Sequence, residues 1–162
     1  MTIALRPIEA SDERLLYEIY ASTRVEELAA VPWSGEQKAA FLWQQFVAQH
    51  RHYQDNYPGA SFDVILHDGA SAGRLYVARW PQEIRLIDIA VLPAFRHAGI
   101  GGFLMRKLLD EGAATGRRVS IHVERQNPAM RFYERLGFYP AEDLGVYIRM
   151  EWSPPPQAKI AS

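Results

Sequence analysis

A strand, a glycine-rich joint, a helix and a second strand follow one another in the second half of this chain, and this order constrains the fold most. The run Ile84–Leu92 is apolar on both faces around one acid, Asp88, which predicts a buried central strand. After Pro93 apolar residues recur at helical spacing, which predicts a helix over 99–114. "RVSIHVE", at 118–124, predicts the next strand, so the sheet contains a strand–helix–strand unit.

A meander of three strands leads into this unit. Two β-rich runs flank "HDGASAG", in which Asp68-Gly69 is a hairpin signal, and a turn at Trp80-Pro81 precedes the third run. Start and stop signals predict the other elements. These are a strand at 2–6, a helix at 12–21 with Ser11 as N-cap, a helix at 35–54 capped by Ser34, a helix capped by Asn127 that ends at Gly137, and two closing strands.

These elements predict an α+β fold with a central mixed, mostly antiparallel sheet and helices on both of its faces. The 162 residues suffice for one domain with a real core. We expect that domain over 1–152 and a flexible tail, "SPPPQAKIAS", over 153–162.

Composition narrows the function classes. The formal net charge is −1, so no basic field points to nucleic acid or to an anionic membrane. Cysteine is absent, which excludes disulfides, thiolate nucleophiles and cysteine metal ligands. No apolar run reaches the length of a signal peptide core or of a membrane span. We expect a cytoplasmic protein.

Three glycines, Gly99, Gly101 and Gly102, stand where the helix after Pro93 begins. Each glycine in a helix costs about 1 kcal/mol relative to alanine. A helix N-terminus presents unpaired N–H groups and partial positive charge, and glycines let an anion approach that backbone. Arg96 adds a fixed charge, so this segment is a candidate phosphate site. The alternative is that the glycines only allow close packing of helix on sheet.

Two familiar nucleotide sites fit this segment poorly. A P-loop requires a lysine followed by serine or threonine after the glycines, and none is present. A dinucleotide-binding Rossmann site would use Glu124 at the end of the next strand, but its third glycine would fall at Leu104. The loop from Val91 to Gly99 is also too long for the tight first turn of that site.

The segment "VLPAFRHAGIGGFLMRKLL" resembles the acyl-CoA-binding segment of the GCN5-related N-acetyltransferases (GNAT), whose pattern is Gln/Arg-x-x-Gly-x-Gly/Ala. "NPAMRFYERLGF" is similar to a second stretch of that family, with its alanine one place early. The two motifs occur in the family's order. The resemblance covers 84–150 closely and 1–83 only in element order, and it implies a single-domain GNAT-like fold.

The resemblance implies acetyl-CoA as cosubstrate and no metal. The pyrophosphate would bind the amides that follow Arg96, and the backbone of the preceding strand would polarise the thioester carbonyl. A neutral amine would then attack directly, without an acyl-enzyme. Asn127 would cap its helix first and contact the cosubstrate second. The implied binding residues are Ile89, Ala90, Val91, Arg96, His97, Ala98, Gly99, Ile100, Gly101, Gly102, Asn127 and Phe132.

Three residues are candidates for proton transfer. Tyr133 is the candidate general acid for the departing thiolate, and the alternative is a core tyrosine bonded to backbone. Asp88 and Glu83, on the strand that leads to the thioester site, are candidates for the base. An acid in a buried strand needs a reason, and structural pairing with Arg85 or Arg118 is the alternative for both.

The histidines and aromatic residues outside these motifs have plainer explanations. His50 and His52 are two apart on a helix and cannot face one metal ion. His122, among apolar residues of a strand, is expected to be a core histidine. The aromatic residues of the second helix region are expected in the core, although in the resembling family this region walls the acceptor site; they are Trp33, Trp43, Tyr53 and Tyr57.

Three functions are compatible with the sequence. The first is an N-acetyltransferase that transfers the acetyl group of acetyl-CoA to a primary amine of a small molecule or peptide. The second is a CoA-binding regulatory module without turnover, and the third is a Rossmann-like oxidoreductase. The expected partner is the amine acceptor, with neither nucleic acid nor membrane, and a homodimer is compatible with the sequence.

Overall fold

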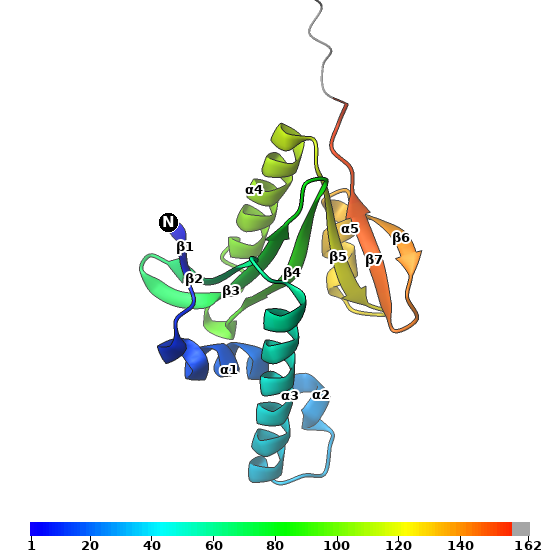
Figure 1. The fold of residues 1–162 in the computed structure, drawn as a ribbon. Coiled ribbons are helices and arrows are strands. Elements are labelled where there is room, and N and C mark those ends of the chain that lie inside the picture. Colours follow the sequence, from blue (N-terminus) through cyan, green and yellow to red (C-terminus); the bar gives the residue numbers. More distant parts are fainter. Residues whose placement is uncertain (157–162) are drawn as a thin grey trace, which may run out of the picture. The chain divides into compact units, whose positions relative to one another are not determined.

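A computed structural model describes residues 1–156 of the chain. Within these residues, seven strands form one sheet in the order β1-β2-β3-β4-β5-β7-β6 (Figure 1). The strands are β1 (Ile3–Pro7), β2 (Ser61–His67), β3 (Ala70–Arg79), β4 (Glu83–Val91), β5 (Arg118–Glu124), β6 (Tyr139–Asp143) and β7 (Tyr147–Trp152).

The sheet is mixed. β4 runs parallel to β5, with Glu83 opposite Arg118 and Leu86 opposite Ile121. β5 pairs antiparallel with β7 over Val119–Glu124, and the pairs β1·β2 and β6·β7 are antiparallel too. The crossover between β4 and β5 contains the helix α4 (Ile100–Thr115), as a parallel pair requires. The predicted α+β fold class is confirmed.

Local sequence signals explain the hairpin and the long helix. Asp68 and Gly69 have φ angles of 49° and 84°, the left-handed pair that a two-residue type I′ hairpin needs between β2 and β3. Helix α3 (Gly35–Asn56) begins with the predicted cap, because the Ser34 hydroxyl accepts from the Gln37 amide at 3.1 Å. The Gln37 side chain accepts in return from the Ser34 amide at 2.9 Å, which completes a capping box.

The start of α1 (Glu13–Ser22) differs from the prediction. Asp12, and not Ser11, is the N-cap residue, after one 3-10 turn. The Asp12 carboxylate accepts two hydrogen bonds from Arg6 of β1, both 2.8 Å long, and one from the Glu9 amide at 2.7 Å. The predicted Ser11 cap is wrong because an ion pair to a strand fixes this turn. The short helix α2 (Val25–Ala29) was not expected from the sequence either.

The helix predicted between Asn127 and Gly137 and the two closing strands after it are present. Helix α5 (Ala129–Arg135) follows Asn127, whose Oδ1 accepts from the Ala129 amide at 2.9 Å. The Asn127 side chain therefore caps this helix, although Pro128 holds the formal cap position. Gly137, with φ +101°, ends the helix in the left-handed conformation that favours glycine.

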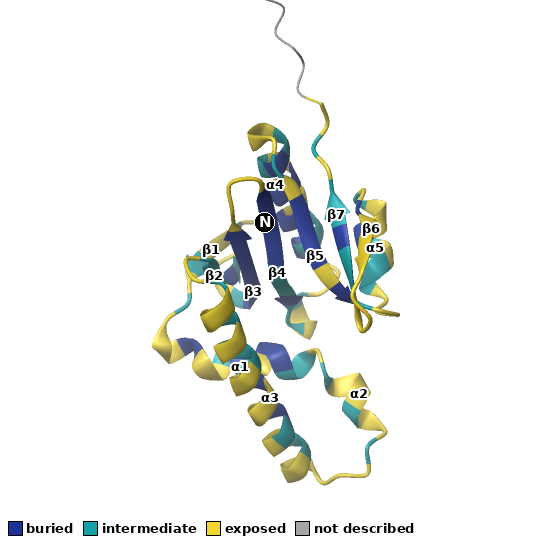
Figure 2. Ribbon diagram, turned by 45° about the vertical axis from the view of Figure 1, so that its right-hand side comes forward, coloured by how far each residue is buried: buried dark blue, intermediate teal, exposed yellow. Residues whose placement is uncertain are grey.

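The described chain divides into two compact units, residues 1–76 with 88–100, and residues 77–87 with the described residues from 101 onward. In the first unit α1 packs on α3, and buried side chains come from both helices and from β2 and β3. In the second unit the core lies between α4, α5 and the strands, and the buried positions of β4 and β5 are dark in Figure 2. The second core includes Ile84, Leu86, Leu104, Met105, Leu108, Val119, Ile121, Tyr133, Phe138 and Met150.

Two further expectations concern the whole chain. Across residues 1–156, no helix is both long and apolar enough to cross a membrane. The predicted tail begins at Ser153, and its residues 157–162 lie outside the described part of the chain.

Candidate active site

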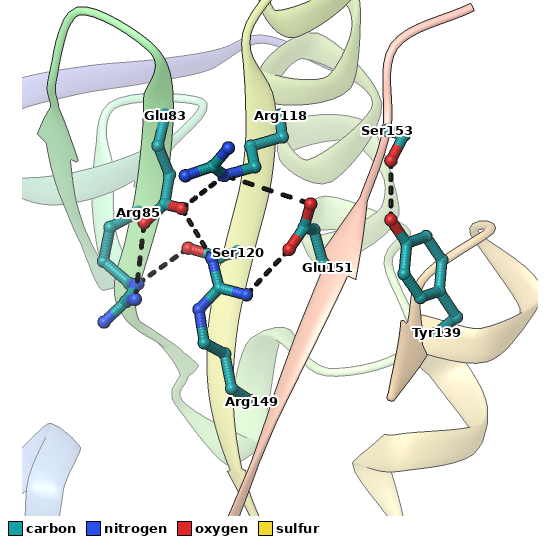
Figure 3. Close-up of polar contacts among 8 residues, drawn as sticks. All are labelled: Glu83, Arg85, Arg118, Ser120, Tyr139, Arg149, Glu151 and Ser153. Carbon is teal, nitrogen blue, oxygen red and sulfur yellow. Dashed lines mark hydrogen bonds and ion pairs between the residues drawn. The ribbon is translucent and has the colours of Figure 1, made fainter. Parts of the chain in front are cut away.

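Glu83, the first residue of β4, is the centre of a charged cluster in the second unit (Figure 3). Its Oε1 accepts from Arg118 at 2.7 Å and from Arg149 at 2.5 Å. Its Oε2 accepts from Arg85 at 3.4 Å. Arg149 also reaches Glu151 at 2.7 Å, so strands β4, β5 and β7 are linked through these side chains.

The Glu83 carboxylate is committed to this cluster. Burial by itself would raise the pKa of Glu83, but hydrogen bonds from Arg118 and Ser120 and the charges of Arg149 and Arg85 outweigh burial, so the pKa is lowered. Both oxygens carry partners, and the residue is only 7% exposed. The structural pairing with Arg85 or Arg118 that the sequence offered for both acids is confirmed for Glu83. It is wrong for Asp88, whose arginine is Arg74 of β3.

Asp88 has a different environment, in the first unit. Its Oδ2 accepts from Nε of Arg74 at 2.6 Å. Nη2 of Arg74 lies 2.5 Å from the same oxygen and donates to Gln49 of α3 at 2.8 Å. In residues 1–156 the other carboxylate oxygen, Oδ1, has no hydrogen-bond partner, and the side chain is 24% exposed. Asp88 therefore offers one oxygen to a ligand.

The segment that joins β4 to α4 has an unusual backbone. After the single turn Pro93–Phe95, His97 and Gly99 adopt positive φ angles of 66° and 79°, and α4 begins at Ile100. Successive residues that alternate in this way aim their N–H groups into one concavity. The first amides of a helix have no partner within the helix. Backbone donors of this segment are thus available to an anion.

The glycines of this segment are not required by packing inside the protein. A Cβ built on Gly101 meets no described atom within 4 Å, and its φ angle is not positive. The same holds for the space around Gly99, where only the positive φ favours glycine. At Gly102 the nearest atom, 3.2 Å away, is the flexible end of Arg106. Packing within the described chain therefore does not require glycine at 101, and the alternative of close helix–sheet packing lacks support there.

Arg96 is exposed and bends back toward the strand. Its Nε donates to the carbonyl oxygen of Val91 at 3.2 Å. Val91 is the last residue of β4, whose residues Ile89 to Val91 are expected to face the thioester. Arg96 therefore closes the loop on the end of the strand, and its remaining guanidinium nitrogens have no partner in residues 1–156.

Tyr133 lies on α5 in the second unit. It is 7% exposed and packs edge to face against Phe132 and Phe138, with ring centroids 5.4 and 5.8 Å apart. This packing fixes the position of the Tyr133 ring. A fixed ring is expected both for a general acid and for a core tyrosine. The role of Tyr133 as an acid stays a prediction.

His122 is not a core residue. It is exposed on β5, opposite Arg149 of β7. Partial desolvation and the positive charges of Arg85 and Arg149 lower the pKa of His122. The prediction was wrong because alternation along a strand does not reveal which face a helix covers.

β4 and β5 are paired over only part of their length. Their register joins Glu83–Leu86 to Arg118–Ile121, and no further pair between these strands occurs in the described chain. β5 continues beside β7 as far as Glu124. The end of β4, residues 87–91, therefore keeps backbone groups that are not used by β5.

A family model settles the classification. The model of the acetyltransferase (GNAT) family matches residues 15–138, which include β4, the glycine segment and Tyr133. The chain belongs to the GNAT family. Members of this family are acyl-CoA-dependent N-acetyltransferases, and acetyl-CoA is their typical cosubstrate. The Rossmann alternative is excluded, because a Rossmann sheet is mostly parallel and this sheet is mostly antiparallel.

Solved structures show the same GNAT fold. The PaiA N-acetyltransferase from Thermoplasma acidophilum, in complex with coenzyme A, is 19% identical, with a TM-score of 0.69 over 94% of this chain and 99% of that one. The ribosomal-protein-S18-alanine N-acetyltransferase from Escherichia coli is 21% identical, with a TM-score of 0.64 over 99% of both chains.

One curated relative shares a shorter stretch with this GNAT chain. The cysteine-rich protein 2-binding protein from Mus musculus is 34% identical over 61 residues, which cover 38% of this chain. The match spans 8% of the length of that relative.

Sequence reasoning did not find Arg74 and Gln49. They stand 14 and 39 residues before Asp88 and lie on different elements from it. The one available signal was a charged residue, Arg74, inside the otherwise small and apolar run "ASAGRLYVA".

Proposed function

We propose that this GNAT protein transfers the acetyl group of acetyl-CoA to a primary amine of a small molecule or peptide by direct attack. The observation that carries the proposal is the glycine segment, where Gly101 is demanded neither by its φ angle nor by packing. A glycine that the protein itself does not need is explained by a ligand that approaches the backbone closely.

The glycine segment would bind the pyrophosphate. The amides of residues 97–102 supply donors, and Arg96 supplies charge beside them. The backbone of Ile89–Val91 would polarise the thioester carbonyl, since the end of β4 is not paired with β5.

Asp88 would accept the proton of the attacking amine through Oδ1, the oxygen that Arg74 does not hold. The amine nitrogen forms a bond to the carbonyl carbon, and the carbon–sulfur bond breaks with its electron pair on sulfur. Tyr133 would donate a proton to the departing thiolate. No acyl-enzyme is needed, in agreement with a sequence that has no cysteine. The same absence suits the reducing cytoplasm in which we place the protein.

The acceptor would be identified by a library of amines, with the release of free CoA thiol as the signal. Thermal-shift titration with acetyl-CoA, and with NAD as control, measures binding separately. We expect acetyl-CoA to raise the melting temperature, NAD to leave it unchanged, and at least one amine to release thiol. Binding without turnover for any amine would instead support the regulatory module.

A further inference from the structure

Arg74 is a buried cation in the middle of β3. Its side chain is 3% exposed, and a guanidinium in such a place destabilises the fold unless it is paired and hydrogen-bonded. A leucine or methionine would fill the same volume at no such cost. The residues that Arg74 contacts must therefore explain why an arginine stands at this buried position.

Arg74 holds Asp88 asymmetrically. An arginine and a carboxylate commonly meet as two parallel hydrogen bonds, one to each oxygen. Here both Nε and Nη2 lie on Oδ2, at 2.6 and 2.5 Å. The arrangement leaves Oδ1 without a partner in residues 1–156, on a side chain that solvent reaches.

Two neighbours fix the guanidinium. Gln49 accepts from Nη2 at 2.8 Å, which ties the group to helix α3. The ring of Tyr76, a fully buried residue, lies 5.0 Å from the central guanidinium carbon. These contacts hold the Arg74 side chain in one orientation, and Arg74 in turn holds the Asp88 carboxylate in one orientation.

We propose that Arg74, tied to α3 by Gln49, is a positioning residue that holds Asp88 with its Oδ1 presented to the acceptor amine. This inference rests on the proposed function. Arg74 and Gln49 touch neither substrate. They act by keeping the proton acceptor in one place, and a misplaced base slows proton transfer without weakening the binding of acetyl-CoA.

The test uses the full chain and two probe amines. Benzylamine is mostly ammonium at neutral pH and must lose a proton, whereas aniline is already neutral. The variants are R74M, R74K and D88N, with R79M as matched control. Arg79 is also an arginine of β3 paired with a carboxylate, Glu111, at 2.6 Å, and it has no role in the proposed site.

We expect R74M to lower kcat for benzylamine about tenfold or more, and D88N at least as much. For aniline both losses should be clearly smaller, because less proton transfer is required. R74K should recover part of the rate, and R79M should behave as the unmodified protein. The KM for acetyl-CoA should stay unchanged in all four variants.

Equal losses with both amines in R74M would overturn the proposal, since they would indicate a structural role only. A full rate in R74M would overturn it as well. If R74M does not fold, R74K and Q49L test the proposal in its place. For each, the ratio of the benzylamine rate to the aniline rate is compared with that of the unmodified protein. If the unmodified protein acetylates neither amine nor any amine of the library, the proposed function fails first, and this inference fails with it.

Discussion

The two acids of β4 stand on one strand and have opposite surroundings. Glu83, at the start, has both oxygens occupied by Arg118, Arg149 and Arg85. Asp88, further along, has one arginine on one oxygen. The first is what a structural ion cluster requires, and the second is what a proton acceptor requires. We assign the two proposed roles by the number of cationic partners, since both residues are acids of the same strand.

The contrast extends to the glycines of the chain. At Gly112, in the last turn of α4, a Cβ would lie 2.9 Å from both the Arg117 carbonyl oxygen and a Trp152 ring carbon, so packing demands glycine there. Gly101, at the start of the same helix, has free space around it. We therefore expect substitutions near Gly101 and Asp88 to impair function, and substitutions near Glu83 to impair stability.

Gly101→Glu offers the largest test of this contrast. A carboxylate would fill and repel the proposed pyrophosphate site, so acetyl-CoA binding should be abolished while the melting temperature changes little. Gly35→Glu is the matched control, because Gly35 also begins a helix and also has nothing within 4 Å of its Cβ position. Titration by thermal shift or calorimetry measures both. An affinity within about threefold of the unmodified protein, about 0.7 kcal/mol, would show that the phosphate binds elsewhere.

Tyr133→Phe tests whether the second unit contributes chemistry as well as stability. Loss of a positioned acid should lower kcat by roughly 10²–10⁴ and leave acetyl-CoA affinity unchanged, because the ring packing survives. The loss should shrink for an acyl donor whose thiol leaves more readily. A core role predicts instead a stability loss of about 0.5–1.5 kcal/mol with normal turnover. Measuring kcat, affinity and melting temperature on one preparation distinguishes these results.

Glu83→Gln tests whether the other acid of β4 contributes to stability and not to chemistry. Removal of this carboxylate leaves three arginines close together, and breaking a buried ion pair costs about 3–5 kcal/mol. Arg118 is 45% exposed on its side chain and can turn to water, so we expect the lower end, about 3 kcal/mol. Urea unfolding measures it. The kcat of the folded fraction should be near normal, and a stable but inactive variant would assign Glu83 a chemical role.

Arg96→Ala should weaken acetyl-CoA binding by about 1.5–3 kcal/mol, the value of a charge-assisted hydrogen bond. Its proposed partner does not change during the reaction, so kcat should hold. Steady-state kinetics with acetyl-CoA varied separates the two constants. Unchanged affinity with a reduced kcat would contradict the assignment.

The smallest expected effect is that of Asp12→Asn on the unfolding free energy. Asp12 serves as an acid with a purely structural role for comparison. Its hydrogen bond to Arg6 lowers its pKa from 3.8 to about 2. A lowered pKa in the folded state adds stability above the unfolded value, and this stability is lost as pH falls from about 4 through 2. The difference in unfolding free energy between the protein and Asp12→Asn, about 1–2 kcal/mol at pH 6 after solvent screening, should therefore shrink by pH 2.5. Urea unfolding at several pH values checks it.

Local features of the fold could be predicted because they depend on residues close in sequence. The Ser34 cap, the Asp68-Gly69 hairpin and the strand–helix–strand order are all settled within a few positions. The cap of α1 could not be predicted, since the competing partner, Arg6, lies on a strand. The two sequence motifs identified the family. Of the proposed site, they located the glycine segment.

The sequence by itself determined that this chain is a GNAT protein with a glycine-rich joint at the start of a helix, because both motifs are contiguous. Tertiary structure alone decided which acid of β4 keeps a carboxylate oxygen without a partner in residues 1–156. Arg149 is 66 residues from Glu83, and Arg74 is 14 residues from Asp88. Which cations meet which carboxylate depends on strand order and register, and strand order is set by packing of the whole sheet, not by any local pattern.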